Sequence, residues 1–151
     1  MTGWAAGVAT LVAGDLGGQD NVVGITPIFT VPDVAATVEY YRDRLGFEVV
    51  FVSSPEGVGD YGAVARGGSQ IHFRQGTPPE TPGVDGGVYI QVRDVDRFYA
   101  EIRERGAFGE SFPRAFAAIR EHPPEDKDYG LRDTIFVDLN GYVVCAGTPR
   151  E

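Results

Sequence analysis

The second half of this chain repeats the pattern of the first half, and this repeat constrains the fold more than any single residue. Residues 26–34 lead into a helical pattern that ends at Gly46, and residues 87–95 lead into a similar pattern that ends at Gly106. Each copy contains a strand, an aspartate, an amphipathic helix, a glycine and further strands. Self-similarity at a fixed spacing indicates two equivalent structural units. A site between the copies would draw matching residues from both.

The first copy, residues 24–75, predicts one helix and four strands. Asp33 can accept the free N–H groups of the first helical turn, and Gly46 can end the helix in a left-handed conformation. The apolar face of this helix recurs at helical spacing, at Val34, Val38, Tyr41 and Leu45. Strands are expected at 25–31, 47–52, 61–66 and 70–74, the last two joined as a hairpin at Gly67-Gly68.

The second copy, residues 87–147, follows a linker at 76–86 that is rich in proline and glycine. Asp94 can cap its helix, whose apolar face contains Val95, Phe98 and Ile102. Strands are expected at 87–92, 115–121, 131–137 and 142–146, with a loop from His122 to Asp128 and a turn at 138–141. Residues 1–22 precede both copies and are interpreted as an N-terminal extension, either loosely ordered or an extra strand.

Alternation along the strands predicts which side chains share a sheet face. One face is uniformly apolar and should lie under the helices. The other is mixed and contains the side chains of Thr26, Ile28, Gln70, His72, Arg74, Tyr89, Gln91 and Cys145. Such a face indicates a concave, ligand-sized surface, although an antiparallel sheet can also turn a polar face to water. Tyr89, Phe136 and Ile28 are unfavourable facing solvent, and they favour the cavity.

The charge balance excludes some partners. The formal net charge is -9, whereas nucleic acids and anionic membranes both require clustered lysine and arginine. The same charge favours a cationic ligand, although an acidic surface can simply aid solubility. Cys145 is the only cysteine, so no intrachain disulfide is possible. Arg42 is the first basic residue, so a secretory signal is not expected, and we expect a cytoplasmic protein.

Several short segments, in this order and spacing, resemble one family. They are Val31-Pro32-Asp33-Val34, Tyr40-Tyr41-Arg42, Leu45-Gly46-Phe47, Val92-Arg93-Asp94-Val95, Phe98-Tyr99, Tyr129-Gly130-Leu131-Arg132 and Asp138-Leu139-Asn140-Gly141. Together they resemble the vicinal oxygen chelate superfamily, in its glyoxalase/bleomycin-resistance protein/dioxygenase branch. The resemblance implies an α+β fold, in which two tandem β-α-β-β-β modules form curled mixed sheets around a shared cavity. It also implies a homodimer.

The resemblance bears directly on metal binding. Metal-dependent members of the superfamily bind a divalent ion through His, Gln or Glu on the first and last strands of the modules. The matching positions in this chain are Thr26, His72, Gly87 and Cys145. A catalytic metal usually has three protein ligands and one open position, and only His72 and Cys145 are good donors. We therefore expect no metal and no other cofactor, and the metal-dependent activities of the family are disfavoured.

His72 and Cys145 each have alternative interpretations. His72 is most simply a structural hydrogen-bonding residue, but it can also act in proton transfer or contribute to a partial metal site. Cys145 is more typical of a small buried hydrophobe than of a nucleophile, because no basic residue near it in sequence would lower its pKa. His122, next to two prolines, is interpreted as a loop residue.

Two functions follow from these observations. The first is a non-catalytic protein, similar to bleomycin-resistance proteins, that sequesters an aromatic and optionally cationic small molecule such as an antibiotic. The second is a glyoxalase- or dioxygenase-like enzyme that uses His72 as a base or as a partial metal ligand. A structural or regulatory domain is a third, less specific alternative. The predicted ligand-binding residues are Thr26, Ile28, His72, Arg74, Tyr89, Gln91, Tyr129, Arg132, Phe136 and Cys145.

Overall fold

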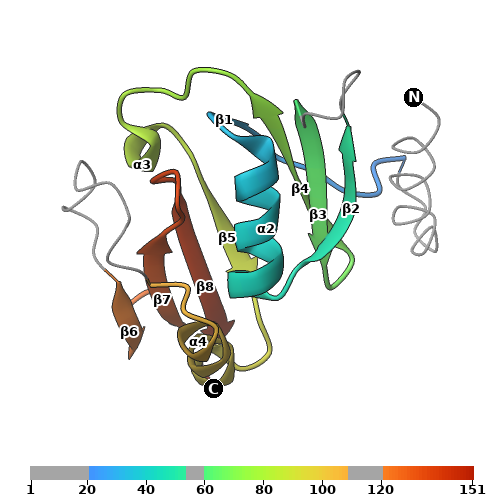
Figure 1. The fold of residues 1–151 in the computed structure, drawn as a ribbon. Coiled ribbons are helices and arrows are strands. Elements are labelled where there is room, and N and C mark those ends of the chain that lie inside the picture. The colour runs from blue at the N-terminus through green and yellow to red at the C-terminus, as the bar shows by residue number, and fades with distance from the viewer. Residues whose placement is uncertain (1–20, 54–59, 109–120) are drawn as a thin grey trace. The chain divides into compact units, whose positions relative to one another are not determined.

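The chain divides into two compact units, Met1–Thr77 and Pro78–Glu151. The structure, a computed structural model, describes residues 21–53, 60–108 and 121–151 (Figure 1). The boundary between the units falls inside the predicted linker at 76–86. Most of the predicted N-terminal extension at 1–22, and nearly all of the predicted strand at 115–121, lie outside the described residues.

The first unit is a four-stranded mixed sheet with one helix on it. The strand order is β1-β4-β3-β2, with β1 parallel to β4 and the other pairs antiparallel. Helix α2 covers one face of this sheet (Figure 1). These elements are β1 Ile28–Val31, α2 Val34–Leu45, β2 Glu48–Ser53, β3 Tyr61–Arg66 and β4 Ser69–Gln75.

Both ends of α2 form as the sequence predicts. The Asp33 carboxylate accepts the N–H of Ala36 at 3.0 Å, and Gly46 ends the helix with φ 72°. The predicted apolar face of α2 is buried against the sheet. Because this helix takes one face of the sheet, every second side chain of each strand is left on the opposite face.

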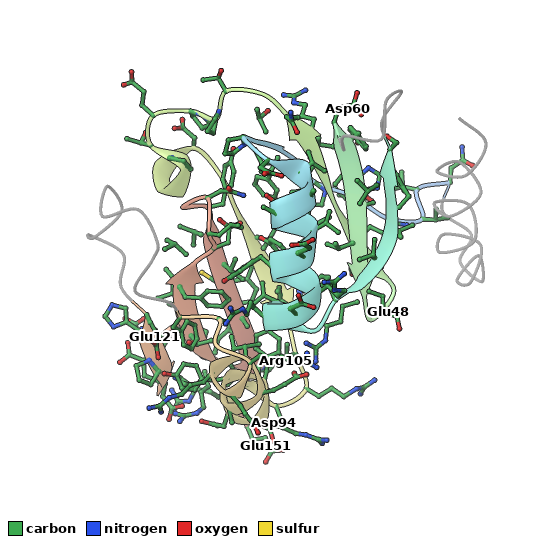
Figure 2. The ribbon with its side chains drawn as sticks, viewed as in Figure 1. Glu48, Asp60, Asp94, Arg105, Glu121 and Glu151 are labelled. Carbon is green, nitrogen blue, oxygen red and sulfur yellow. The ribbon has the colours of Figure 1, made fainter. Side chains whose placement is uncertain are left out.

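The second unit repeats this topology. Its strand order is β5-β8-β7-β6, with β5 parallel to β8 and the other pairs antiparallel. Asp94, labelled in Figure 2, caps helix α4 by accepting the N–H of Arg97 at 3.0 Å. The elements are α3 Pro82–Asp85, β5 Gly87–Gln91, α4 Val95–Glu104, β6 His122–Asp126, β7 Leu131–Val137 and β8 Val143–Pro149. The predicted α+β fold of two β-α-β-β-β units is confirmed.

Two predicted segments differ from the structure. The expected loop at 122–128 is largely strand β6, although it contains Pro123 and Pro124. Proline is tolerated at the edge of a sheet. Among the described strands β6 pairs only with β7, with a register shift between His122 and Glu125 that contains both prolines. The linker also contains the short helix α3. None of the helices within the described ranges is long and apolar enough to cross a membrane.

Candidate functional site

In each unit, the helix-free face of the sheet carries most of the candidate site residues. In the first unit, a Cβ built on Gly62 of β3 would lie 2.9 Å from Val34 of α2, so the neighbouring side chains Tyr61 and Ala63 point away from that helix. In the second unit, Thr148 of β8 bonds the N–H of Val95 at the start of α4. The alternate residues of β8 therefore lie on the helix-free face.

The helix-free face of the first unit is organised around His72. This side chain is 7% exposed, and both ring nitrogens are hydrogen-bonded. Its Nε2 lies 2.9 Å from Oε1 of Gln70, and its Nδ1 lies 2.8 Å from the hydroxyl of Tyr61. Because a carbonyl oxygen only accepts, this arrangement corresponds to an Nε2–H tautomer whose Nδ1 lone pair accepts the Tyr61 proton. Burial lowers the pKa of His72, which favours the neutral ring.

Two aromatic rings pack with this imidazole. Phe51 stacks on Tyr61 with ring centroids 5.9 Å apart, and both rings meet His72 edge to face. Burial raises the pKa of Tyr61, although the charge of Arg74 opposes the shift. The Tyr61 phenol therefore stays protonated near neutral pH and can keep donating to His72.

A basic side chain lies in the next row of the same face. Arg74 is the ladder partner of both Thr30 and Tyr61, and its Nε donates to the hydroxyl of Thr30 at 2.8 Å. Ile28, the partner of His72, is 52% exposed. The first unit thus presents a cation, a phenol and a neutral imidazole on one surface.

The helix-free face of the second unit carries exposed tyrosines beside a buried acid. Tyr89 is 45% exposed and Tyr129 is 62% exposed, whereas Asp133 is 8% exposed. The Tyr129 hydroxyl donates to Oδ2 of Asp133 at 2.6 Å, and this bond raises the pKa of Tyr129 to about 12. Cys145 lies between Tyr89 and Ile135 in the ladder. Burial, and then the charge of Asp133, raise the pKa of its thiol.

The ladder registers show which positions of the two sheets are equivalent. His72 pairs with Ile28 and Ala63, as Cys145 pairs with Tyr89 and Ile135. By the same registers, Arg74 corresponds to Gly147, Tyr61 to Asp133, and Thr30 to Gln91. The two faces have therefore diverged, because the first carries a basic residue at a position where the second has a glycine, next to a carboxylate.

Seven of the predicted site residues lie on or beside these faces, and Thr26 is an exposed residue ahead of β1. The seven are Ile28, His72, Arg74, Tyr89, Gln91, Tyr129 and Cys145.

The two other predicted site residues, Phe136 and Arg132, lie on the opposite, helix-covered face of the second sheet and so are separated from the residues of the helix-free face. Phe136 is 1% exposed and meets the ring of Phe108 edge to face, with centroids 5.2 Å apart. Arg132 bonds the carboxylate of Asp96 on α4 at 2.9 Å and that of Asp126 at 3.1 Å.

The four positions that would supply metal ligands in this fold have a poor donor set. Gly87 has no side chain, and a Cβ there would lie 2.8 Å from the carbonyl oxygen of Val143. Thr26 offers a hydroxyl, both nitrogens of His72 have protein partners, and the raised pKa of Cys145 disfavours the thiolate. Within residues 21–53, 60–108 and 121–151, no three His, Cys, Asp or Glu side chains are grouped to hold an ion.

A sequence model of the Glyoxalase/Bleomycin resistance protein/Dioxygenase superfamily matches residues 21–145. Among solved structures, a bleomycin resistance determinant encoded on the transposon Tn5 is similar, with TM-score 0.67 and 21% identity over 85% of this chain and 98% of that one. A bleomycin-binding protein from Streptomyces verticillus, complexed with copper(II)-bleomycin, has TM-score 0.63 and 23% identity over 88% and 99%.

A glyoxalase-related enzyme from Clostridium phytofermentans has TM-score 0.62 and 16% identity over 89% of this chain and 99% of that one. None of the curated proteins compared with the chain matches it. At these identities the similar structures establish the shared fold, and the chemistry of the chain has to be argued from its own residues.

Proposed function

The chain belongs to the glyoxalase/bleomycin resistance protein/dioxygenase superfamily, and we propose that within it this protein sequesters an aromatic small molecule, such as an antibiotic, without metal catalysis. The observation that carries the proposal is the pair of exposed tyrosines, Tyr89 and Tyr129, on the helix-free face of the second unit. Exposed aromatic side chains that lie close together on one surface often mark a ligand-binding site. Their rings offer flat surfaces on which a planar ligand can stack.

The donor set supports binding rather than metal-dependent chemistry. A catalytic metal needs about three protein ligands. The equivalent positions here include Gly87, which has no donor, and His72, whose nitrogens are held by Gln70 and Tyr61. A metal would take one of these nitrogens, so recruiting His72 would cost it either the hydrogen bond to Gln70 or the one accepted from Tyr61. We therefore propose that the protein has no metal and no other cofactor.

The similar proteins named above support the same assignment. One is described as a bleomycin resistance determinant, and another is complexed with copper(II)-bleomycin. We extend ligand binding, and with it antibiotic resistance, to this chain as a proposal. We also propose that it acts as a cytoplasmic homodimer.

An enzyme is the second candidate, because one of the similar structures is a glyoxalase-related enzyme and His72 is bonded to a phenol. In such an enzyme, His72 would act as the general base. Two features oppose this use: its Nδ1 lone pair already accepts a proton from Tyr61, and burial lowers its pKa. If His72 were the base, His72→Ala would abolish turnover in a screen of glyoxalase-type substrates.

The binding proposal is tested by isothermal titration and thermal unfolding with metal-free bleomycin and a panel of other aromatic antibiotics. We expect at least one ligand to bind with a dissociation constant in the micromolar range or below and to raise the unfolding temperature. Each of Tyr89→Ala and Tyr129→Ala should weaken that binding by about fivefold, since one aromatic contact contributes roughly 1 kcal/mol. Val52→Ala, which removes an exposed side chain from β2, is the matched control. No heat and no stabilisation with any ligand would contradict the proposal.

A further inference from the structure

We propose that Asp133 determines the charge of the ligand, so that the cluster of Tyr89, Tyr129, Asp133 and Gly147 accepts a planar organic cation and rejects an anion. We call these four residues the Asp133 cluster. The inference deepens the proposed function and rests on it, because it assumes that this face of the second unit binds a ligand. It adds a residue that was not among the predicted site residues and gives the ligand a chemical class.

The Asp133 carboxylate is buried but not neutralised by the residue that binds it. Its bonded partner is the Tyr129 phenol, 2.6 Å away, which is a neutral donor. A hydrogen bond from a neutral phenol stabilises a carboxylate while leaving its negative charge in place. Because water is largely excluded from Asp133, which is 8% exposed, that charge is screened less than a surface charge would be.

Two nearby basic residues, Lys127 and Arg132, form ion pairs with carboxylates other than Asp133. Lys127 forms an ion pair with Glu125, the ladder neighbour of Asp133. Arg132 is held on the opposite face of the sheet by Asp96 and Asp126. Lys127 also interacts with the charge of Asp133, but it is shared with Glu125, so two carboxylates face one cation and this part of the face keeps a net negative charge.

The absence of a side chain at Gly147 allows the ring of Tyr89 to lie beside this carboxylate. A Cβ at Gly147 would overlap the Tyr89 hydroxyl and would lie 3.0 Å from Cβ of Asp133. Tyr89 and Asp133 therefore approach each other across Gly147. The first unit has Arg74 at the equivalent position, so the same location carries a positive side chain in one copy and a tyrosine ring next to a negative charge in the other.

Rings next to a carboxylate favour one ligand class. The face of a tyrosine ring attracts a cation through its quadrupole, and the carboxylate adds a direct charge interaction. A planar cation can use both at once, by stacking on an exposed ring and placing its charge towards Asp133. An anion of the same shape could also stack on the rings, but the Asp133 carboxylate would repel it and weaken its binding. The cluster therefore discriminates between ligands by charge.

The test compares two planar fluorescent dyes, the cation ethidium and the anion fluorescein, in fluorescence titrations of the full chain. We expect the wild type to bind ethidium more tightly, and to lose affinity for it as salt is added. Asp133→Asn keeps an oxygen that can accept from Tyr129 but removes the charge. This variant should bind ethidium about tenfold more weakly or worse, since an interaction with a charged group contributes more to binding than one with a neutral group. Fluorescein should bind to this variant no more weakly than to the wild type.

Two further variants separate charge placement from net charge and from folding. Glu104→Gln removes a carboxylate from the exposed end of α4 and should leave ethidium binding unchanged. Gly147→Ala should displace Tyr89 and weaken the binding of ethidium, while its circular dichroism spectrum should match that of the wild type. Unchanged ethidium affinity in Asp133→Asn would overturn the inference, as would a wild type that binds neither dye. If aromatic antibiotics still bound in either case, the proposed function would stand and only the charge assignment would fail.

Discussion

His72 is the residue whose role differs most between the two functional hypotheses. Its ring is buried and bridged between Gln70 and Tyr61, and burial lowers its pKa. In the unfolded chain the imidazole has its ordinary pKa of about 6.5. At pH values between the folded-state and unfolded-state pKa of His72, the unfolded chain binds more protons than the folded one. The free energy of unfolding should therefore fall as the pH drops below about 6.5.

Urea unfolding at a series of pH values between neutrality and mildly acidic conditions checks this prediction. His72→Gln cannot titrate and should flatten the pH dependence in that window, whatever its effect on stability at neutral pH. His122→Gln, on the edge strand β6, is the matched control and should leave the contribution of His72 intact. A pH dependence that is the same in His72→Gln as in the wild type would mean that His72 is not held neutral by the fold.

Tyr129 and Asp133 make a second residue-level prediction. The hydrogen bond to Asp133 raises the pKa of Tyr129 to about 12. In Asp133→Asn the acceptor loses its negative charge, so the phenol should ionise at lower pH, closer to the ordinary value of about 10. A pH-jump titration of phenolate absorbance measures the shift, with Tyr129→Phe identifying the missing signal. An unchanged Tyr129 pKa in Asp133→Asn would show that the two side chains are not bonded in solution.

Strand alternation predicts several site residues correctly, whereas size and aromaticity alone misplace one. Alternation placed His72, Arg74, Tyr89 and Cys145 on the helix-free faces, because each lies close to a capped helix or a glycine turn. The size and aromaticity of Phe136 suggested a cavity residue, whereas its strand phase places it with Val144 on the helix-covered face.

Asp133 was not among the predicted site residues, although the sequence contains a pattern that places it on the helix-free face. The turn at 138–141 closes on the pair Val137 and Val143, so counting outward places Asp133 opposite Gly147, on the face of Cys145. The bond between Asp133 and Tyr129 depends on the turn conformation before β7, which the sequence does not specify.

At the scale of elements, the packing of α2 on the first sheet depends on a glycine in β3. A Cβ at Gly62 would lie 2.9 Å from Cγ1 of Val34 and 3.0 Å from Cγ2 of Val38. Both valines are buried and branched at Cβ, so their methyl groups have little room to turn aside. Gly62→Ala should therefore lower the free energy of unfolding by about 1–3 kcal/mol, as overpacked cores do.

Chemical denaturation of Gly62→Ala measures this loss. Gly24→Ala is the matched control, because a Cβ there meets no atom within 4 Å. Equal stability of the two variants would show that α2 tolerates a wider separation from the sheet than the structure indicates.

Most of the elements were predictable because their ends carry strong local signals. Asp33 and Asp94 both cap helices, and Gly67 and Gly68, both with positive φ, turn the hairpin between β3 and β4. Strand β6 was not predictable, since its two prolines match a loop and only the edge position next to β7 makes them acceptable.

At the scale of the whole molecule, two copies of one topology carry different chemistry at equivalent positions. Duplication supplies the same backbone ladders twice, so a residue change in one copy alters one face and leaves the other intact. The pairs His72 and Cys145, and Arg74 and Gly147, show this divergence. The proposed function requires only that matched positions of both copies lack good metal donors, as Thr26 and Gly87 do.

The metal content of the whole protein is therefore the most direct test of the non-catalytic assignment. After dialysis against zinc, nickel, manganese and iron salts, elemental mass spectrometry of untagged protein should find clearly substoichiometric metal. None of the ions should raise the unfolding temperature, because a ligand stabilises a fold only when it binds the folded state more tightly than the unfolded one. His72→Ala and Cys145→Ser should leave both readouts unchanged. Near one equivalent of metal per chain, lost in His72→Ala, would mean that His72 exchanges Tyr61 or Gln70 for an ion, and the enzyme hypothesis would then take precedence.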